Sequence, residues 1–333
     1  MSISMLLVDV YIVEGSDSIV GPGYVRIASG VISHIGVGEP PEEARLAELV
    51  LGGAGRLLYP GFGAALVYPE TYIIRDYIGQ HKGLPGSNVE ECIREMSSEE
   101  AFYSILMALY EMSLAGYARV ILATPHVSAA IRAVQEAGID AAILVPVRDA
   151  DELDTVLQLI KDSSVLLGLL APKKLESLVS SEDVKARCIV ENECSITCNN
   201  KSIIPFGCEG DGVIAPLYPF VTPAQILWLY RDQGLVSLTE EAHKLVDKEY
   251  VALGKENKAY ISVYDLSEPP SWIGPIDYAT PYVLTPLVRV ETLISAGRLV
   301  VDSGEHLFLG PGVSEKASNV LLSVRKRCKK VLG

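Results

Sequence analysis

Apolar and polar positions alternate with two different periods through the middle of the chain. The capping box formed by Ser97 and Glu100 begins a segment with apolar residues at helical spacing, and Gly116 ends it. Apolar strand-like runs and amphipathic segments then follow in turn, with strands beginning about 21–24 residues apart. The expected strands are Arg119–Ala123, Ala141–Val147, Val165–Leu170 and Ala186–Val190, and the expected helices are Ser128–Ala137, Ala150–Ser163 and Pro172–Ser181. This alternation predicts right-handed βαβ units and a parallel sheet that is buried on both faces.

The two ends of the chain are rich in strand-like sequence. The expected strands are Met5–Val13, Gly23–Ile27 and Val31–Val37 at the start, and Tyr260–Leu266, Val288–Ala296, Arg298–Val301 and His306–Leu309 at the end. A short helix is expected within Pro41–Leu51. Because two β segments that flank a domain can combine into one sheet, we expect a composite β domain. The last stretch, Ser314–Leu332, is predicted to be a helix with a basic end, where cations favour the helix dipole.

The pattern is less regular between Glu191 and Pro219, where Cys, Asn, Gly and Pro are common. Only short strands near Ile203–Phe206 and Val213–Ala215 are expected in this region. Helices over Thr222–Gln233 and Ser237–Leu253 are predicted to follow it.

Composition and charge narrow the classes of function. Hydrophobic residues make up 49% of the 333 residues, which predicts a large core and excludes general disorder. The 28 basic and 42 acidic residues leave a net charge of −14, so nucleic acid is not expected as a ligand. The chain has no apolar stretch of about 20 residues and no recognisable signal peptide, so a cytoplasmic protein without membrane contact is predicted.

Six cysteines leave three interpretations open. They are Cys92, Cys188, Cys194, Cys198, Cys208 and Cys328. Their spacing does not match paired C-x-x-C zinc ligands. Free thiols are favoured because a cytosol keeps thiols reduced, with hyperthermophiles as the exception. A Cys194–Cys198 or Cys198–Cys208 disulfide and a metal site are the alternatives.

Three segments carry motifs in a particular order. Residues 55–62 have the pattern Gly-x-x-hydrophobic-x-Pro-Gly-hydrophobic, residues 115–125 join a helix end to a strand, and residues 254–265 with 290–301 form a paired β segment. In this order they resemble the amidohydrolase superfamily and, within it, the dihydroorotase-like cyclic amidohydrolases. The resemblance implies a TIM-like (β/α) barrel between two β segments.

The predicted fold is therefore α/β, with a reduced or distorted TIM-like barrel and a small composite β domain formed by both chain ends. We place the barrel at residues 61–253, the β domain at residues 1–60 and 254–312, and the C-terminal basic helix at residues 313–333. The barrel is expected to be trimmed because its span is short for eight complete βα units, which typically need about 200 residues or more.

The expected metal ligands of this family are missing. A His-x-His pair would follow the first strand of an active relative, but Leu66 and Tyr68 stand at those positions. Neither an aliphatic side chain nor a neutral phenol is an ordinary zinc ligand. Pro216 and Leu217 similarly occupy the expected places of a later aspartate and histidine. We therefore predict no metal and no other cofactor.

Four other side chains are candidates for a site: His126, Glu70, Asp76 and His81. His126 comes directly after an expected strand, at the end of the barrel where such folds keep their chemistry. Glu70 and Asp76 follow the first strand, and together with His81 they could form a rebuilt site at the same mouth. The alternatives are a loop histidine and ordinary solvated ion pairs.

Two functions from different classes remain open. The first is a dihydroorotase-like protein without metal, acting as a non-catalytic scaffold in a homo-oligomer or with a partner enzyme. The second is a divergent, metal-independent hydrolase of cyclic amide C–N bonds. The first is favoured because loss of the metal removes both its bound hydroxide and its Lewis acidity. The aliphatic-rich composition, with 5 methionines, also suggests a thermostable protein.

Overall fold

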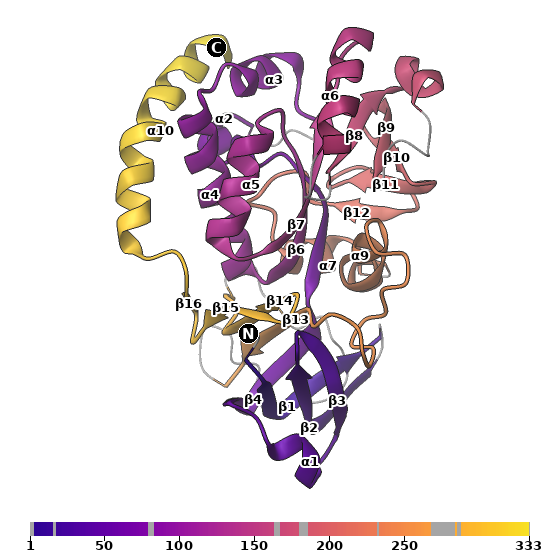
Figure 1. The fold of residues 1–333 in the computed structure, drawn as a ribbon, viewed down its shortest axis with the longest axis vertical. Helices are drawn as coiled ribbons and strands as arrows, with labels where there is room; N and C mark the ends of the chain where they lie inside the picture. Colours follow the sequence, from indigo (N-terminus) through magenta and orange to yellow (C-terminus); the bar gives the residue numbers. More distant parts are fainter. Residues whose placement is uncertain are drawn as a thin grey trace.

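A computed structural model of the chain describes residues 3–15, 18–78, 83–162, 167–179, 186–231, 233–267, 284 and 288–332. The structure contains two eight-stranded sheets. One sheet forms a separate layer at the lower end of the molecule in Figure 1, and the other forms a barrel above it. The predicted α/β class, with a trimmed TIM-like barrel and a composite β sheet, is confirmed.

Both ends of the chain contribute to the first sheet, which has the order β16-β15-β14-β13-β4-β1-β2-β3. Its strands are β1 (Met5–Glu14), β2 (Ser18–Ala28), β3 (Val31–Val37), β4 (Leu49–Pro60), β13 (Ile261–Asp265), β14 (Thr292–Ser295), β15 (Arg298–Asp302) and β16 (Glu305–His306). The short helix α1 (Glu42–Arg45) lies between β3 and β4 in the chain. Antiparallel pairing of β4 with β13 joins the two sets of strands. A small apolar core, including Leu7, Ile27 and Ile294, lies against this sheet. The domain boundaries assigned from the sequence stay a prediction.

Gly61 connects the two sheets, because β4 ends at Pro60 and the first barrel strand begins at Phe62. The Gly61 amide donates to the Tyr260 carbonyl oxygen at 2.7 Å. A Cβ atom at Gly61 would lie 2.6 Å from the Tyr260 carbonyl carbon and 2.6 Å from Ala118 Cβ. Only glycine therefore allows the chain to pass so close to β13 at this point.

The barrel strands have the order β12-β11-β10-β9-β8-β7-β6-β5. They are β5 (Phe62–Val67), β6 (Tyr117–Ala123), β7 (Asp140–Pro146), β8 (Leu167–Pro172), β9 (Arg187–Asn192), β10 (Ser195–Cys198), β11 (Lys201–Pro205) and β12 (Val213–Ala215). Seven strands run in one direction, and β10 runs against its two neighbours. A parallel bridge between Val67 and Leu217 brings the first and last strands together, so the barrel is nearly closed.

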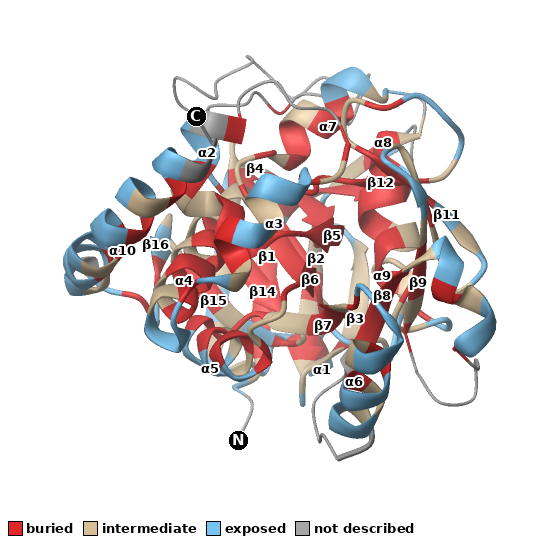
Figure 2. Ribbon diagram, turned by 90° about the horizontal axis from the view of Figure 1, so that it is seen from above, coloured by how far each residue is buried: buried red, intermediate tan, exposed pale blue. Residues whose placement is uncertain are grey.

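Helices cover the outside of the barrel, while buried residues gather on the strands at its centre (Figure 2). The helical elements are η1 (Pro69–Ile74), α2 (Arg75–Ile78), α3 (Ser87–Arg94), α4 (Ser98–Ala115), α5 (Val127–Ala137), α6 (Ala150–Asp162), η2 (Lys173–Leu178), α7 (Pro223–Leu229), α8 (Gly234–Val236), η3 (Ser237–Glu241), α9 (Ala242–Lys244) and α10 (Pro311–Leu332). No helix among the described residues is long and apolar enough to span a bilayer.

Helix α4 forms as its sequence predicts. The Ser97 side chain accepts from the Glu100 amide, and the Glu100 carboxylate accepts from the Ser97 amide, which completes the capping box. At the other end, Gly116 has a φ of 103° and ends the helix in the left-handed conformation. The helix thus leads directly into β6, and η1, α2 and α3 lie between it and β5.

The barrel departs from the expected pattern in its second half. The reversed strand β10 was not predicted, and it replaces the helix that would ordinarily connect β9 to β11. The helix expected over Pro172–Ser181 is the short 3₁₀ segment η2. The helix expected over Ser237–Leu253 ends at Lys244, after a π-helical turn. These short connections explain how a barrel fits into fewer residues than usual.

All six cysteines are paired in disulfides: Cys92–Cys328, Cys188–Cys198 and Cys194–Cys208. The favoured free thiols and both suggested pairings were therefore wrong. Cys188 and Cys198 face each other on the antiparallel strands β9 and β10, and this strand pairing was absent from the predicted elements. The redox argument relied on a cytoplasmic location, which stays untested.

Candidate functional site

A pocket of about 540 Å³ opens at the carboxyl ends of β5, β7, β8 and β9. We call it the mouth pocket. It is lined by Tyr68, Leu84, Pro85, Gly86, Ser87, Glu90, Arg94, Pro146, Val147, Arg148, Leu170, Ala171, Pro172, Lys174, Val190, Asn192 and Glu193. This is the end at which TIM barrels carry their chemistry, so the pocket is the candidate site.

Helix α3 and the loop after β7 form the charged wall of the mouth pocket. Arg94 donates to Glu152 Oε1 at 3.2 Å and to the Pro146 carbonyl oxygen at 3.2 Å. Arg148 also pairs with Glu152, at 2.8 Å. Partial burial raises the pKa of Glu90, although the positive charges of Arg94 and Arg148 oppose this rise. The wall thus combines the guanidinium groups of Arg94 and Arg148, both paired with Glu152, with the partly buried carboxyl group of Glu90.

Tyr68 also lines the mouth pocket and comes directly after β5. Its side chain is 5% exposed, and burial raises the pKa of its phenol well above the usual value. Its amide donates to the Leu217 carbonyl oxygen at 2.7 Å. Tyr68 therefore offers the pocket a neutral hydroxyl group, which is a hydrogen-bonding group and not a metal-binding phenolate.

Leu66 lies in the barrel wall and is fully buried. Its carbonyl oxygen accepts from the Leu217 amide at 2.9 Å. Leu217 is also fully buried, with a φ of 58°, and follows β12. Two apolar side chains therefore pack where the first and last strands of the barrel meet.

Glu70 is a buried carboxyl group close to, but outside, the mouth pocket. Its Oε1 atom accepts a short hydrogen bond from the Thr124 hydroxyl group, and its Oε2 atom is buried with no partner among the described residues. Burial raises its pKa to about 7, which outweighs the lowering effect of the hydrogen bond from Thr124. Because Glu70 is 0% exposed, its carboxyl group does not face a ligand in the pocket.

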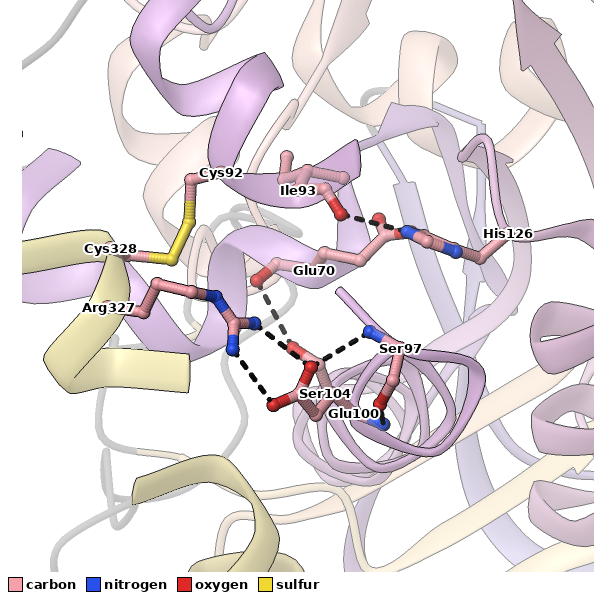
Figure 3. The surroundings of a disulfide bond; sticks show 9 residues. All are labelled: Glu70, Cys92, Ile93, Ser97, Glu100, Ser104, His126, Arg327 and Cys328. Carbon is pink, nitrogen blue, oxygen red and sulfur yellow. Dashed lines mark hydrogen bonds and ion pairs between the residues drawn. A yellow bond between two sulfur atoms is a disulfide. The ribbon is translucent and has the colours of Figure 1, made fainter. Parts of the chain in front are cut away.

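His126 is linked to Glu70 through Thr124. The His126 amide donates to the Thr124 hydroxyl oxygen at 2.9 Å, and that hydroxyl group in turn donates to Glu70. The His126 ring donates from Nε2 to the Ile93 carbonyl oxygen at 2.8 Å, as Figure 3 shows. The ring thus connects the start of α5 to α3, and it does not line the mouth pocket.

The other two candidates lie elsewhere. Asp76 is exposed on α2 and forms an ion pair with Arg325 of α10, beside a separate groove and away from the mouth pocket. His81 lies outside the described residues. The structure therefore brings Glu70 and His126 together but places Asp76 apart from them.

The other described histidines do not line the mouth pocket. His243 is fully buried near the start of β5, where its Nε2 atom donates to the Gly61 carbonyl oxygen at 2.8 Å. Burial lowers the pKa of His243 to about 3. His306 accepts from the amides of Phe308 and Leu309 through Nδ1. His34 lies on β3 in the β domain.

Several residues at the barrel mouth were not singled out from the sequence. Thr124 follows β6 directly and holds both Glu70 and His126. Its position at a strand end was a usable signal. The sequence has no comparable signal for Glu90, Arg94 and Arg148. These residues come together only because α3 packs across the ends of the strands.

Comparison with known proteins identifies the fold. No model of a protein family matches this sequence, and no curated protein matches it. An amidohydrolase structure from a Sargasso Sea environmental sample matches with a TM-score of 0.70 at 14% identity, covering 97% of this chain and 99% of that one. The chain therefore has the amidohydrolase fold.

Two zinc-containing structures share this amidohydrolase fold. Atrazine chlorohydrolase from Arthrobacter aurescens TC1, complexed with zinc, matches with a TM-score of 0.68 at 10% identity, covering 95% of this chain and 100% of that one. An adenosine deaminase from Xanthomonas campestris with bound zinc matches with a TM-score of 0.68 at 11% identity, covering 97% and 98%. Zinc is thus a metal that the fold can carry.

The described residues of this chain do not fit a zinc ion at the barrel mouth. The ends of β5, β6 and β12 carry Leu66, Tyr68, Thr124 and Leu217 in place of imidazoles or further carboxylates. Nowhere in the described ranges do three or more His, Cys, Asp or Glu side chains gather closely enough to hold a metal. Zinc in proteins takes nitrogen, sulfur and carboxylate ligands. Near the end of β6, Glu70 and His126 carry such groups, but Glu70 accepts from Thr124 and the His126 ring donates to the Ile93 carbonyl oxygen.

Proposed function

We propose that this chain is a metal-free member of the amidohydrolase superfamily whose barrel serves as a binding scaffold and not as a catalyst. The observation that carries the proposal is the apolar closure of the barrel by Leu66 and Leu217, beside the neutral phenol of Tyr68. The likeness to dihydroorotases rests on sequence motifs alone and is part of the proposal.

The chemistry of the site supports this reading. In metal-dependent hydrolases the ion activates water and polarises the bond that is cleaved. At the mouth, Arg94 and Arg148 both pair with Glu152, and the buried Glu70 accepts a hydrogen bond from Thr124. The two guanidinium groups can bind and orient a polar molecule, whereas the buried Glu70 does not line the pocket as an exposed general base.

The pocket itself suits a small molecule. Apolar residues such as Leu170 and Val190 lie beside the polar Tyr68, Arg94 and Asn192, a combination typical of ligand sites. We further propose that the protein acts in an assembly, either with copies of itself or with a partner enzyme. Two large apolar side chains of α7, Trp228 and Leu229, are each 65% exposed and are consistent with such contacts.

The test combines metal analysis with activity assays on the full chain. Protein purified without chelators is dialysed, its zinc content is measured, and it is assayed with dihydroorotate, hydantoin, atrazine and adenosine, before and after incubation with zinc. We expect less than about 0.1 zinc per chain and no turnover above the blank. Stoichiometric zinc that survives dialysis, or robust turnover of any of these compounds, would overturn the scaffold function.

A second candidate is metal-independent hydrolysis of cyclic amide C–N bonds. The observation in its favour is Glu70, a carboxyl group whose pKa lies at about 7, where a general base is effective. Its complete burial counts against direct contact with a substrate. Hydrolysis of hydantoin by zinc-free protein, abolished in E70Q, would establish this function in place of the scaffold.

A further inference from the structure

Helix α10 is fastened to the wall of the mouth pocket by a covalent link. The Cys92–Cys328 disulfide joins positions 236 residues apart, one in α3 and the other in the last turns of α10. In Figure 1, α10 runs along the outer side of the molecule beside α4. Figure 3 shows the disulfide between the two helices. Both cysteines are buried, with 1% and 0% exposure.

Helix α3 buries few of its residues, and Arg94 attaches its inner side to Glu152 and to the Pro146 carbonyl oxygen. Of its eight residues, only Cys92 and Ile93 are buried. Three other residues of the same helix, Ser87, Glu90 and Arg94, line the mouth pocket. On the inner side, the Ile93 carbonyl oxygen accepts from the ring of His126. One short helix therefore carries the disulfide, the contact to α5 and three residues of the pocket wall.

The other attachments of α10 near Cys328 are noncovalent. The helix packs against the body through Ala317, Leu321 and Val324, which lie on one face. Its ion pairs join Arg327 to Glu100 and Arg325 to Asp76, but these are partly exposed, and such pairs contribute little. The disulfide therefore adds a covalent attachment to the last turns of α10, which also carry several like charges.

We propose that the Cys92–Cys328 disulfide is a redox-sensitive strap that fixes α3, and with it the outer wall of the mouth pocket. A dithiol reductant attacks one sulfur, the Cys92–Cys328 bond breaks, and closure of the reductant's own disulfide leaves two cysteine thiols. Two electrons and two protons pass from the dithiol to the protein. The last turns of α10 then separate from α3, and α3 loses its outer attachment.

Hydrogen exchange on the full chain tests this strap, with alkylation and mass spectrometry to measure how far each disulfide is reduced. In the oxidised protein, amides of residues 87–94 and 320–332 are expected to be protected. After reduction by dithiothreitol, we expect their exchange to become at least about 10-fold faster. The double variant C92A/C328A should show the same fast exchange without dithiothreitol and no further response to it.

The matched control is C188A/C198A, which removes a disulfide between two barrel strands. It should keep the slow exchange of α3 until dithiothreitol is added. If C92A/C328A does not fold, the wild-type comparison still decides the matter. Unchanged α3 protection after complete reduction of Cys92–Cys328, or alkylation of these cysteines before any reduction, would overturn the strap. The inference rests on the proposed function only in treating the pocket as a binding site. The result of the hydrogen-exchange experiment therefore does not depend on the result of the zinc and turnover assays.

Discussion

The Leu217 amide donates to the Leu66 carbonyl oxygen at 2.9 Å, and this bond joins the last part of the barrel to its first strand. Both side chains are fully buried. The bond uses only backbone atoms, so it does not require these side chains. What the leucines add is apolar packing where the first and last strands of the barrel meet. The closure of the barrel thus combines a backbone hydrogen bond with two buried apolar side chains.

Restoring a His-x-His pair should not restore a metal site. In L66H/Y68H, two imidazoles replace buried side chains, while Glu70 and the His126 ring stay hydrogen-bonded to Thr124 and to the Ile93 carbonyl oxygen. We expect no stoichiometric zinc and no turnover. We also expect a loss of about 2–5 kcal/mol in the free energy of unfolding, because an unpaired buried polar group is unfavourable. Zinc analysis and urea unfolding measure these effects.

The control for that variant is L66M/Y68F, which keeps both positions apolar. It should lose less than about 2 kcal/mol, since volume-conserving apolar changes are well tolerated. Tight zinc binding by L66H/Y68H would mean that further ligands are available, and His81, outside the described residues, would be the first to examine.

Glu70 should make the protein less stable as the pH rises. Its pKa is raised from 4.5 to about 7 in the folded protein, so between these values the folded state binds more protons than the unfolded state. The free energy of unfolding therefore falls as the pH increases through this range. At about 1.4 kcal/mol for each unit of pKa, the full loss is about 3 kcal/mol above pH 7.

The variant E70Q removes this dependence because its side chain does not ionise. At pH 8 it should be more stable than the wild type by up to about 3 kcal/mol, and near pH 4.5 the two should differ little. Urea unfolding at several pH values measures the difference. E136Q, on the exposed face of α5, serves as the control and should leave the slope unchanged. Equal slopes for E70Q and the wild type would show that Glu70 titrates normally.

The sequence predicted those parts of the fold that depend on local signals. The capping box at Ser97 and the stop at Gly116 define α4, and the apolar runs locate β6 and β7. Strand β10 was missed because its four residues gain their stability from pairing with β9 and β11, which a local pattern does not reveal. At the site, Leu66, Tyr68, Glu70 and His126 could be selected from motifs and strand ends. The linking role of Thr124 required the packed structure.

Gly116 should tolerate no side chain. A Cβ atom there would lie 1.9 Å from the hydroxyl oxygen of Tyr264, and the backbone has a φ of 103°. We expect G116A to lose about 2–4 kcal/mol in the free energy of unfolding, from steric displacement and the strained backbone together. Gly86 is the matched control, because its Cβ position has no neighbour within 4 Å and its φ is −68°. G86A should change stability by less than about 1 kcal/mol. Similar losses in the two variants would contradict the packing of Tyr264 against the end of α4.

The disulfides should contribute unequally to stability. Cys92–Cys328 closes a loop of 236 residues, whereas Cys188–Cys198 closes one of 10. In the chain-entropy account, a longer loop restricts the unfolded chain more, so the expected contributions are about 5 and about 3 kcal/mol. C92A/C328A should therefore unfold at a lower guanidinium concentration than C188A/C198A. Unfolding followed by circular dichroism under non-reducing conditions measures both midpoints. The reverse order would mean that the tightly packed β9–β10 pair depends on its disulfide more than α10 does, which would assign the main stabilising link to the barrel and not to the C-terminal helix.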